Sequence, residues 1–515
     1  MEDKILSCIK QAKIHSLSTD IKEYLSHFSH EEQNLNSVQK AKFQNFVECL
    51  LQTCSIFLHK KQSDDNDVRE IFISIQQCCQ QKYCCFSNLL QVGRSFYHIL
   101  INLLRLKRYN EAIYLSIYLK KVILQILQDG INNTETDIIV HQVYKNFWNH
   151  AIEVKHCQEV HDSLKHILSL RLRRVAFEFL CFKYSELNSI CEQSSKAILL
   201  YITNSNGIIN NKELTAFCTS IWNSLVTNRT FQQSISNEQK KTTIFSVLKM
   251  FKDWNKSLIK YIILKNLSVD ILIWLDDIVE LTKKIGDTDI MNIIQSGTDL
   301  TKCALNILLD QNNSEVYKDI AKDFMKSSNK LMNKDSLVSI IDSYVSVSCY
   351  YLLEIFNMFE REKKNFNSKQ LFSLDSFLDC ITNVCTSTKG LIQSENCSQL
   401  VILIVRLEGR LIKTIREEVQ KSSDANFIKT LIQRGERIMQ QFSIILDMKR
   451  DKYLYEDEYI GTEVGNLGIV LFGKDMHNNA IHCLEFSCEY LTQWIYSDSA
   501  PSEKKKLMQS GLISS

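Results

Sequence analysis

Apolar residues recur at three- and four-residue spacing along most of the chain, and short polar segments separate these stretches. Examples of the spacing are FISIQQCC (72–79), LLRLKRYNEAIYLSIYL (103–119) and FSIILDM (442–448). Such spacing places the apolar side chains on one face of an α-helix. The pattern therefore predicts a succession of amphipathic helices.

The polar segments fall where helical hairpins need their turns. They are INNTET (131–136), TNSNGIINN (203–211), TNRTFQQSISNEQKK (227–241), DQNNS (310–314), EKKNFNSK (362–369) and KSSDAN (421–426), with a charged segment at 450–459. Asn, Asp and Ser in these segments can cap helix ends. The breaks predict five parts: an N-terminal helical array (1–226), a flexible insertion (227–241), a central helical array (242–449), a hairpin of the tetratricopeptide type (450–496), and a loop with an incomplete last helix (497–515).

The best-preserved hairpin signature is VGNLGIVLFGKDMHNNAIHCLEFSCEYL (464–491). Small residues at 468 and 480 would let two helices approach closely, while leucines fill the seam between them. The predicted packing positions are Leu467, Gly468 and Leu471 on the first helix and Ala480, Leu484 and Ser487 on the second.

A second segment, 99–119, repeats this pattern with Ile99, Leu103, Tyr109 and Ala112. It departs from the pattern at Leu100, where a tetratricopeptide unit has a small residue. Between the two segments the period decays, so the remaining units are degenerate. A hairpin array of irregular members is the preferred interpretation, and a set of unrelated helical bundles is the alternative.

Composition narrows the fold class. The 515 residues include a single proline, Pro501, and 13 glycines, whereas an ordinary protein has roughly 5% proline. Strand-rich folds need turn formers at short intervals, and these are missing here. We therefore predict an all-α fold, an irregular right-handed superhelix (solenoid) of antiparallel helical hairpins, similar to TPR and HEAT arrays.

Charge and hydropathy limit the partners. The net charge is +2, from 61 basic and 59 acidic residues, so nucleic acid is not expected as the main partner. The most apolar window, 337–356, contains Asp342 and Glu354, so no membrane span is expected.

The N-terminus MEDKILSCIKQAK is amphipathic and does not have the pattern of a secretory signal. The 18 cysteines are scattered through helical patterns, which is typical of free thiols in the cytosol or nucleus.

The sequence CCQQKYCC holds four thiols, Cys78, Cys79, Cys84 and Cys85, which could bind zinc. On one continuous helix, however, Cys79 and Cys84 would point away from the other two, and no Gly or Pro supplies a turn. Buried or half-buried thiols are the preferred interpretation.

Histidines gather in a second cluster: His150, His156, Cys157, His161 and His166. His150, Cys157 and His161 would share one helical face, but no fourth metal ligand is identifiable, so ordinary core or surface histidines are preferred. The chain contains no G-x-S-x-G, P-loop, G-x-G-x-x-G or H-E-x-x-H motif. We predict no catalytic, cofactor-binding or metal-binding residue, and Lys504 to Lys506 are interpreted as a solvated helix face.

Two blocks resemble the N-terminal helical region of separase, the protease that cleaves cohesin. The first, VYKNFWNHAIEVKHCQEVHDSLKHILSLRLRRVAFEFL (143–180), is similar to a separase segment in which an F-x-x-x-W-like helix leads to a basic hairpin and an apolar helix. The second is the hairpin at 464–491, followed as in the family by Trp494, the loop SDSAPSE and a new helix, KKKLMQ.

The resemblance implies a helical superhelix that binds a securin-like inhibitor along its length and supports a separase protease domain, in cis or in trans. It implies a role in mitotic sister-chromatid separation, in the cytoplasm and nucleus and on the spindle or chromosomes. The family's protease domain is a caspase-like cysteine endopeptidase, and no part of it is found here, so no catalytic residue is carried over. The chain is similar either to a truncated separase or to the separate helical subunit of insect split separases.

Two other functions stay open. One is a generic TPR-type adaptor unrelated to separase, which would be expected to carry a carboxylate-binding cluster of Lys or Arg. The other is a helical enzyme or metal protein built around the cysteine clusters.

Overall fold

The structure is a computed structural model, and it describes residues 1–11, 13–29, 37–60, 65–81, 84–129, 134–156, 162–182, 187–204, 209–227, 237–262, 267–283, 285–309, 323–324, 327–328, 335–362, 374–375, 377–379, 381–382, 398–448 and 458–496. These residues are almost wholly helical and contain no β-strand. Contacts divide the chain into two compact units, Met1–Lys240 (unit 1) and Lys241–Ser515 (unit 2). The predicted all-α fold is confirmed.

Unit 1 is built from helices joined by short turns. Its elements are α1 (Glu2–Lys10), α2 (Leu17–Ser29), α3 (Ser37–Lys60), α4 (Asp65–Cys79), α5 (Leu89–Arg105), α6 (Tyr109–Gln128), α7 (Thr134–Glu153), the 3-10 turn η1 (Val154–His156), α8 (Asp162–Leu180), α9 (Leu187–Asn204), α10 (Asn211–Trp222) and η3 (Asn223–Thr227). The predicted break at 131–136 is shorter than expected, because α7 already begins at Thr134.

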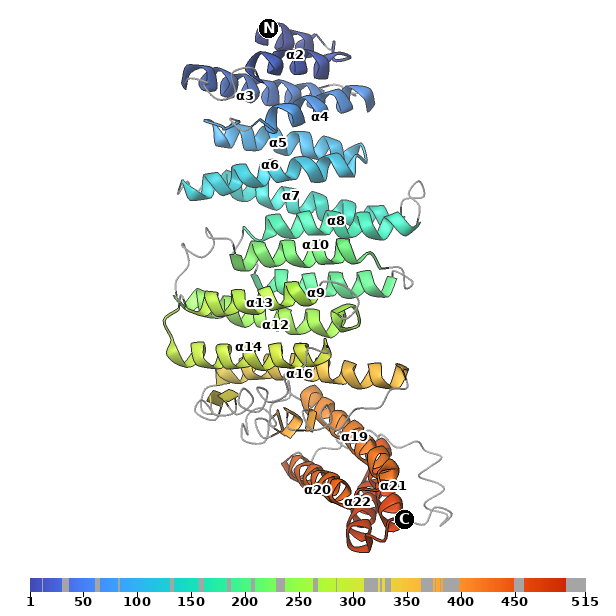
Figure 1. Ribbon diagram of the computed structural model, residues 1–515. Coiled ribbons are helices and arrows are strands. Elements are labelled where there is room, and N and C mark those ends of the chain that lie inside the picture. Colours follow the sequence, from blue (N-terminus) through green and yellow to red (C-terminus); the bar gives the residue numbers. More distant parts are fainter. Residues whose placement is uncertain are drawn as a thin grey trace. The chain divides into compact units, whose positions relative to one another are not determined.

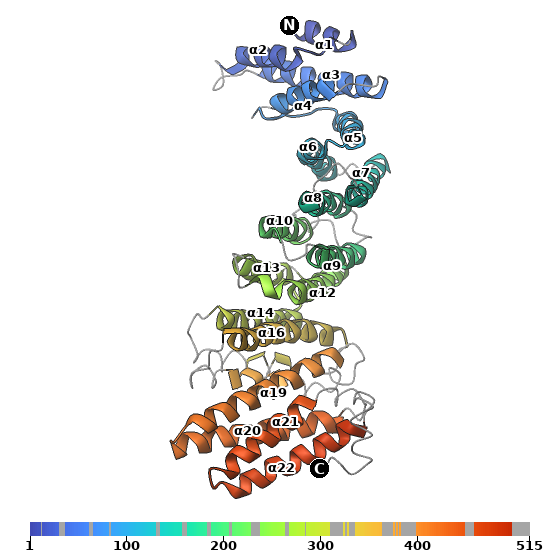
Figure 2. The same ribbon diagram turned by 90° about the vertical axis from the view of Figure 1, so that its right-hand side faces the viewer.

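Helices of unit 1 pack in two layers. Most contact a chain neighbour and the next helix but one: α5 packs on α6 and α7, and α8 packs on α6, α7 and α10. Figure 2 shows α6, α8 and α10 in one layer and α5, α7 and α9 in the other. This double neighbour pattern is how stacked hairpins bury an apolar stripe that no single pair could bury alone.

Aromatic rings connect successive hairpins of unit 1. Trp148 of α7 meets Phe177 of α8 edge to face at 5.5 Å between ring centroids, and Phe177 meets Phe217 of α10 in the same way at 5.9 Å. Phe177 and Phe217 have no exposed surface. Edge-to-face pairs add stabilisation beyond the burial of apolar area, so these rings help hold α7, α8 and α10 together.

Unit 2 consists of longer helices: α12 (Asn237–Ile262, which begins four residues before the boundary), α13 (Leu267–Lys283), α14 (Thr288–Leu308), α16 (Asp335–Glu362), α19 (Ser398–Lys421), α20 (Ala425–Met448), α21 (Glu458–Phe472) and α22 (His477–Tyr496). They follow one another in Figure 1 from yellow-green to red. Packing joins α13 to α14, α14 to α16, α16 to α19, α19 to α20 and α21, and α22 to α20 and α21. The predicted separate part 450–496 is therefore packed into unit 2 through α19 and α20.

The predicted insertion at 227–241 is partly wrong. Its last residues belong to α12, and its first residue ends η3, while 228–236 lie outside the described residues. The boundary between the two units, after Lys240, falls inside this stretch. Residues 450–457 and 497–515, including Lys504 to Lys506 and Pro501, also lie outside the described residues.

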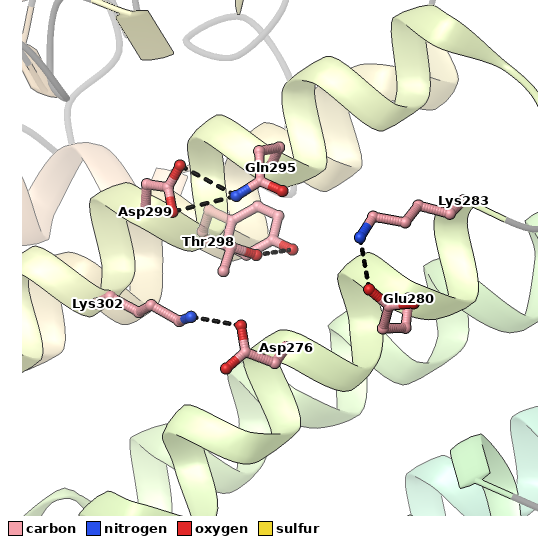
Figure 3. Close-up of polar contacts among 8 residues, drawn as sticks. Asp276, Glu280, Lys283, Gln295, Thr298, Asp299 and Lys302 are labelled. Carbon is pink, nitrogen blue, oxygen red and sulfur yellow. Dashed lines mark hydrogen bonds and ion pairs between the residues drawn. The ribbon is translucent and has the colours of Figure 1, made fainter.

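Charged side chains in unit 2 are paired across helices, both in the interior and at the surface. Lys252 of α12 meets the buried Asp342 of α16 at 2.7 Å. Figure 3 shows Lys302 of α14 reaching the exposed Asp276 of α13. Asn255 of α12 accepts a 2.5 Å hydrogen bond from the buried hydroxyl of Tyr351. Pairing offsets the cost of removing Asp342, Asn255 and Tyr351 from water.

One helical segment, Val338–Met358 of α16, has the length and hydropathy of a membrane span. However, 78% of its most apolar window is buried inside unit 2. Asp342 on this segment pairs with Lys252, and Glu354 pairs with Arg361. These features are those of a core helix.

Candidate functional site

The last hairpin, α21 and α22, is held together by a stripe of glycines. A Cβ atom on Gly468 would lie 2.9 Å from Leu484 Cγ and 3.1 Å from the backbone oxygen of Ala480. A Cβ on Gly461 would lie 2.7 Å from Leu491 Cγ, and one on Gly465 would lie 2.7 Å from Ser487 Oγ. These distances are too short for a larger side chain, so α22 lies directly against the backbone of α21 along the stripe, through its side chains at Gly461 and Gly465 and through its backbone at Gly468.

The predicted packing residues of this hairpin mostly lie in its seam. Leu467, Leu471, Ala480 and Ser487 are buried, and Ser487 Oγ donates a 2.6 Å hydrogen bond to the carbonyl of Gly461. Leu484 was expected to fill the seam, but it lies at the edge and is 36% exposed. The sequence prediction did not include Gly461 and Gly465, although the spacing of four residues between them and of three residues from Gly465 to Gly468 places all three on one helix face.

The earlier predicted hairpin is formed by α5 and α6. Ile99, Leu103, Tyr109 and Ala112 are all buried, and Leu100, at the position where a small residue was expected, is fully buried as well. The α5–α6 interface has no glycine stripe. Side chains therefore separate these helices.

The two hairpins share one turn. In the first, Lys107 has a φ of 59° and the Arg108 amide donates to the carbonyl of Leu103 at 2.9 Å. In the last, Asp475 has a φ of 60° and the Met476 amide donates to the carbonyl of Leu471 at 3.0 Å. This left-handed cap usually requires Gly or Asn. Its occurrence at equivalent positions indicates that both hairpins are units of the same kind.

The CCQQKYCC segment does not continue as a helix. α4 ends at Cys79, and the chain turns so that the Cys84 amide donates to the carbonyl of Gln81 at 3.0 Å. The expectation that a turn here needs Gly or Pro is therefore wrong. Cys79 donates a side-chain hydrogen bond to Cys84, which raises the pKa of Cys79 and lowers that of Cys84. Among the described residues no group of three metal-ligating side chains is assembled.

The histidine cluster is only partly described. His150 Nδ1 lies 2.8 Å from Glu153 Oε2 on the same helix. His166 lies on α8, whereas Cys157 and His161 and the side chain of His156 fall outside the described residues. The predicted shared face of His150, Cys157 and His161 therefore lies partly outside the described residues.

A cavity of about 270 Å³ opens between α6, α8 and α10. Its charged members pair with one another. Glu178 of α8 lies 3.3 Å from Lys120 and 3.8 Å from Arg174, and it accepts a hydrogen bond from Ser220. The apolar lining comes from Leu124, Cys181 and Phe182. Because the buried carboxylate of Glu178 is already paired with Lys120 and Arg174, we find no unpaired charge among the described residues that line this cavity.

A smaller pocket lies on the same helix. It is lined by Lys155, His166, Ser169, Leu170, Arg173, Ala197, Leu200 and Tyr201, from η1, α8 and α9. Its cationic groups have no acidic partner among the described residues. The two pockets flanking α8 thus differ in charge balance.

Large apolar side chains are exposed on several helices. On the last hairpin they are Ile469, Phe472 and Ile481, each more than half exposed, and on α13 they are Val269 and Ile273. Exposed apolar residues gathered on one element are a common feature of protein-binding surfaces.

Comparison with known proteins gives little. No protein-family profile and no curated protein matches the chain. Among solved structures, a "circular tandem repeat protein with novel repeat topology and enhanced subunit contact surfaces" aligns with 90% of this chain and 98% of its own, at 9% identity and a TM-score of 0.29. At that score the likeness adds nothing to the helix contacts described above.

Proposed function

We propose that this chain is a non-catalytic helical scaffold that binds an extended segment of a partner polypeptide. The observation that carries the proposal is the combination of stacked two-layer hairpins with exposed apolar side chains on them. Stacked hairpins present continuous lateral surfaces, and extended segments bind such surfaces through a few apolar anchors.

The specific form of the proposal is a separase-like assembly. It rests on the resemblance of residues 143–180 and 464–491 to the helical region of that family. The bound segment would be a securin-like inhibitor, and the second partner would be a caspase-like protease domain, in cis or in trans. The assembly would act in mitotic sister-chromatid separation, in the cytoplasm and nucleus.

Affinity purification of the tagged chain from synchronised dividing cells tests this form. We expect a securin-like protein and a caspase-like protease sequence among the co-purifying peptides, enriched before anaphase. Recovery of neither would reject the separase-like assembly. A generic adaptor, the alternative, would instead recover the same partners at all stages of the cell cycle.

The scaffold part has its own test. Ile469→Asp with Phe472→Asp places two charges on the exposed face of the last hairpin, and Ile138→Asp makes the same kind of change on α7, where Ile138 is 59% exposed. If the last hairpin is the binding surface, the double variant loses the co-purifying partner and Ile138→Asp retains it. Equal retention by both would exclude this hairpin as the surface.

A further inference from the structure

The pocket between η1, α8 and α9 is built around an arginine that has no ion-pair or hydrogen-bond partner among the described residues. Arg173 is only 8% exposed, and its guanidinium carbon lies 5.1 Å from the ring centroid of Trp148. Its Nε atom is fully buried and has no hydrogen-bond partner. An unpaired buried cation is costly, so this arrangement requires an explanation.

The two neighbouring arginines of α8 each have a glutamate close to the guanidinium. Arg171 pairs with Glu213, and Arg174 lies 3.8 Å from Glu178. Within the described part of the chain, no acidic residue forms an ion pair with Arg173. Burial accordingly lowers the pKa of Arg173 with no opposing carboxylate. Of the three arginines of α8, Arg171 and Arg174 thus have a carboxylate nearby, and Arg173 has none among the residues that the structure describes.

A second cation adds to the charge. Lys155 lines the same pocket, and its pKa is lowered by burial and by the nearby charge of Arg173. His166 and the Tyr201 side chain complete the polar wall. Two cations that repel each other in a shared pocket attract any anion that reaches both.

The pocket is large enough for one or two atoms of a ligand and too small for a whole small molecule. Its volume is about 10 Å³, which is room for roughly one water-sized group. A carboxylate or phosphoryl oxygen has that size and forms strong charge-assisted hydrogen bonds with a guanidinium.

We propose that the Arg173 pocket binds a single oxyanion, a carboxylate or a phosphate ester, carried by an extended peptide segment of a partner protein. The peptide carrier is indicated by the apolar rim. Leu200 lines the pocket and is 44% exposed, and Ala197 and Leu170 line it beside the charged groups. An oxyanion on a peptide with apolar side chains would contact both the cationic groups and Leu200, whereas a free inorganic ion would contact only the cationic groups. The inference does not depend on the separase-like assembly.

Trp148 provides the readout, because its ring lies against the Arg173 guanidinium. The full chain is labelled with 5-fluorotryptophan, and the Trp148 signal is assigned from Trp148→Phe. Fluorine NMR titrations then use inorganic phosphate and three end-blocked tripeptides, Leu-Asp-Leu, Leu-phosphoSer-Leu and Leu-Ser-Leu. We expect the Trp148 signal to shift saturably with at least one acidic peptide and not with Leu-Ser-Leu; whichever acidic peptide binds more tightly identifies the anion.

Variants test the assignment. Lys155→Gln and Arg173→Lys should weaken acidic-peptide binding about fivefold or more, which is the size of one charge-assisted contact. Lys145→Gln, the same charge change at an exposed position of α7, should leave it unchanged. A preserved thermal melt shows that each variant is folded, and Lys155→Gln keeps the test valid if Arg173→Lys does not fold. The proposal is overturned if no acidic peptide shifts the Trp148 signal, if only inorganic phosphate does, or if Lys145→Gln weakens binding as much as Lys155→Gln.

Discussion

Unit 1 and unit 2 are both stacks of helices, but different side chains recur at the contacts between their helices. In unit 1 aromatic rings such as Phe177 and Phe217 fill the space between layers. In unit 2 glycines remove that space: Gly297 lies under the ring of Tyr344, Gly409 against Ile460, and Gly468 against Ala480. Unit 2 also buries more carboxylates, among them Glu408, which has no exposed surface.

The difference shows that one hairpin pattern can be stabilised in two ways. Aromatic spacers supply apolar burial and tolerate variation in the helix separation. Glycine contacts fix the separation and leave no room for a methyl group. Substitutions that exchange these features should therefore act in opposite directions in the two units.

The largest effect is expected from Phe177→Ala in unit 1. It would remove a fully buried ring that contacts both Trp148 and Phe217, at a cost of about 3–5 kcal/mol in the free energy of unfolding. Urea denaturation of the full chain measures the loss, and hydrogen exchange should localise it to α7, α8 and α10. Phe177→Leu, which retains most of the volume, is the control. Equal exchange rates in wild type and Phe177→Ala would show that the ring contacts do not support unit 1.

Glu408→Gln should stabilise unit 2. Burial raises the pKa of Glu408 to about 8 from a usual 4.5. The folded state therefore retains a proton that the unfolded chain releases above pH 4.5, and this group's contribution to stability falls as the pH rises from 4.5 to 8.

At pH 7 the gain from Glu408→Gln should reach about 3 kcal/mol, and it should disappear near pH 4.5. Urea denaturation at pH 4.5, 6 and 7 measures it, with the exposed Glu485→Gln as the control. A gain independent of pH would mean that the carboxyl is not neutral in the folded unit.

Gly297→Ala should destabilise unit 2 by about 1–3 kcal/mol. A Cβ at this position would lie 2.7 Å from Tyr344 Cγ, and the ring is fully buried with its hydroxyl 3.2 Å from Thr298 Oγ1. Hydrogen exchange of α14 and α16 reports the change. Gly297→Ala combined with Tyr344→Leu should recover part of the loss, and no recovery would show that the ring is not the obstacle.

The smallest expected effect is of opposite sign. Gly93→Ala in α5 of unit 1 meets only ordinary contacts, with Val122 Cγ1 at 3.8 Å and Ile139 Cδ1 at 3.9 Å. Alanine is the better helix former, so stability should rise by about 0.5–1 kcal/mol. Thermal denaturation measures the shift. A loss comparable to that of Gly297→Ala would remove the distinction between the two units.

Much of the fold followed from the spacing of apolar residues. The hairpin at 464–491 and the break at 421–426 lie where the sequence predicted them, because a three- and four-residue period and a polar turn are local properties. The predicted break at 227–241 failed in part, since Asn237 to Lys241 can extend a helix as well as interrupt one.

The candidate sites were predicted less well. On one continuous helix Cys79 and Cys84 were expected to point away from Cys78 and Cys85. The helix instead ends at Cys79, and Cys79 donates a hydrogen bond to Cys84. Arg173 received no attention in the sequence, where it reads as one of three basic residues in RLRR. What distinguishes Arg173 from Arg171 and Arg174 is that a carboxylate lies beside each of the other two. One of these carboxylates, Glu213, comes from a different helix, so the sequence around Arg173 does not show the difference.

The sequence by itself determined that this chain is helical, where several of its hairpins turn, and which positions face inward. Helix periodicity and the near absence of proline determine these features because both are local properties of the chain. The tertiary structure alone decided which glycines lie against another helix, which charges are paired, and that the buried Arg173 has no carboxylate beside it in the described part of the chain. Those properties depend on the separation and register of packed helices, and they are set by the shapes of side chains that meet only after folding.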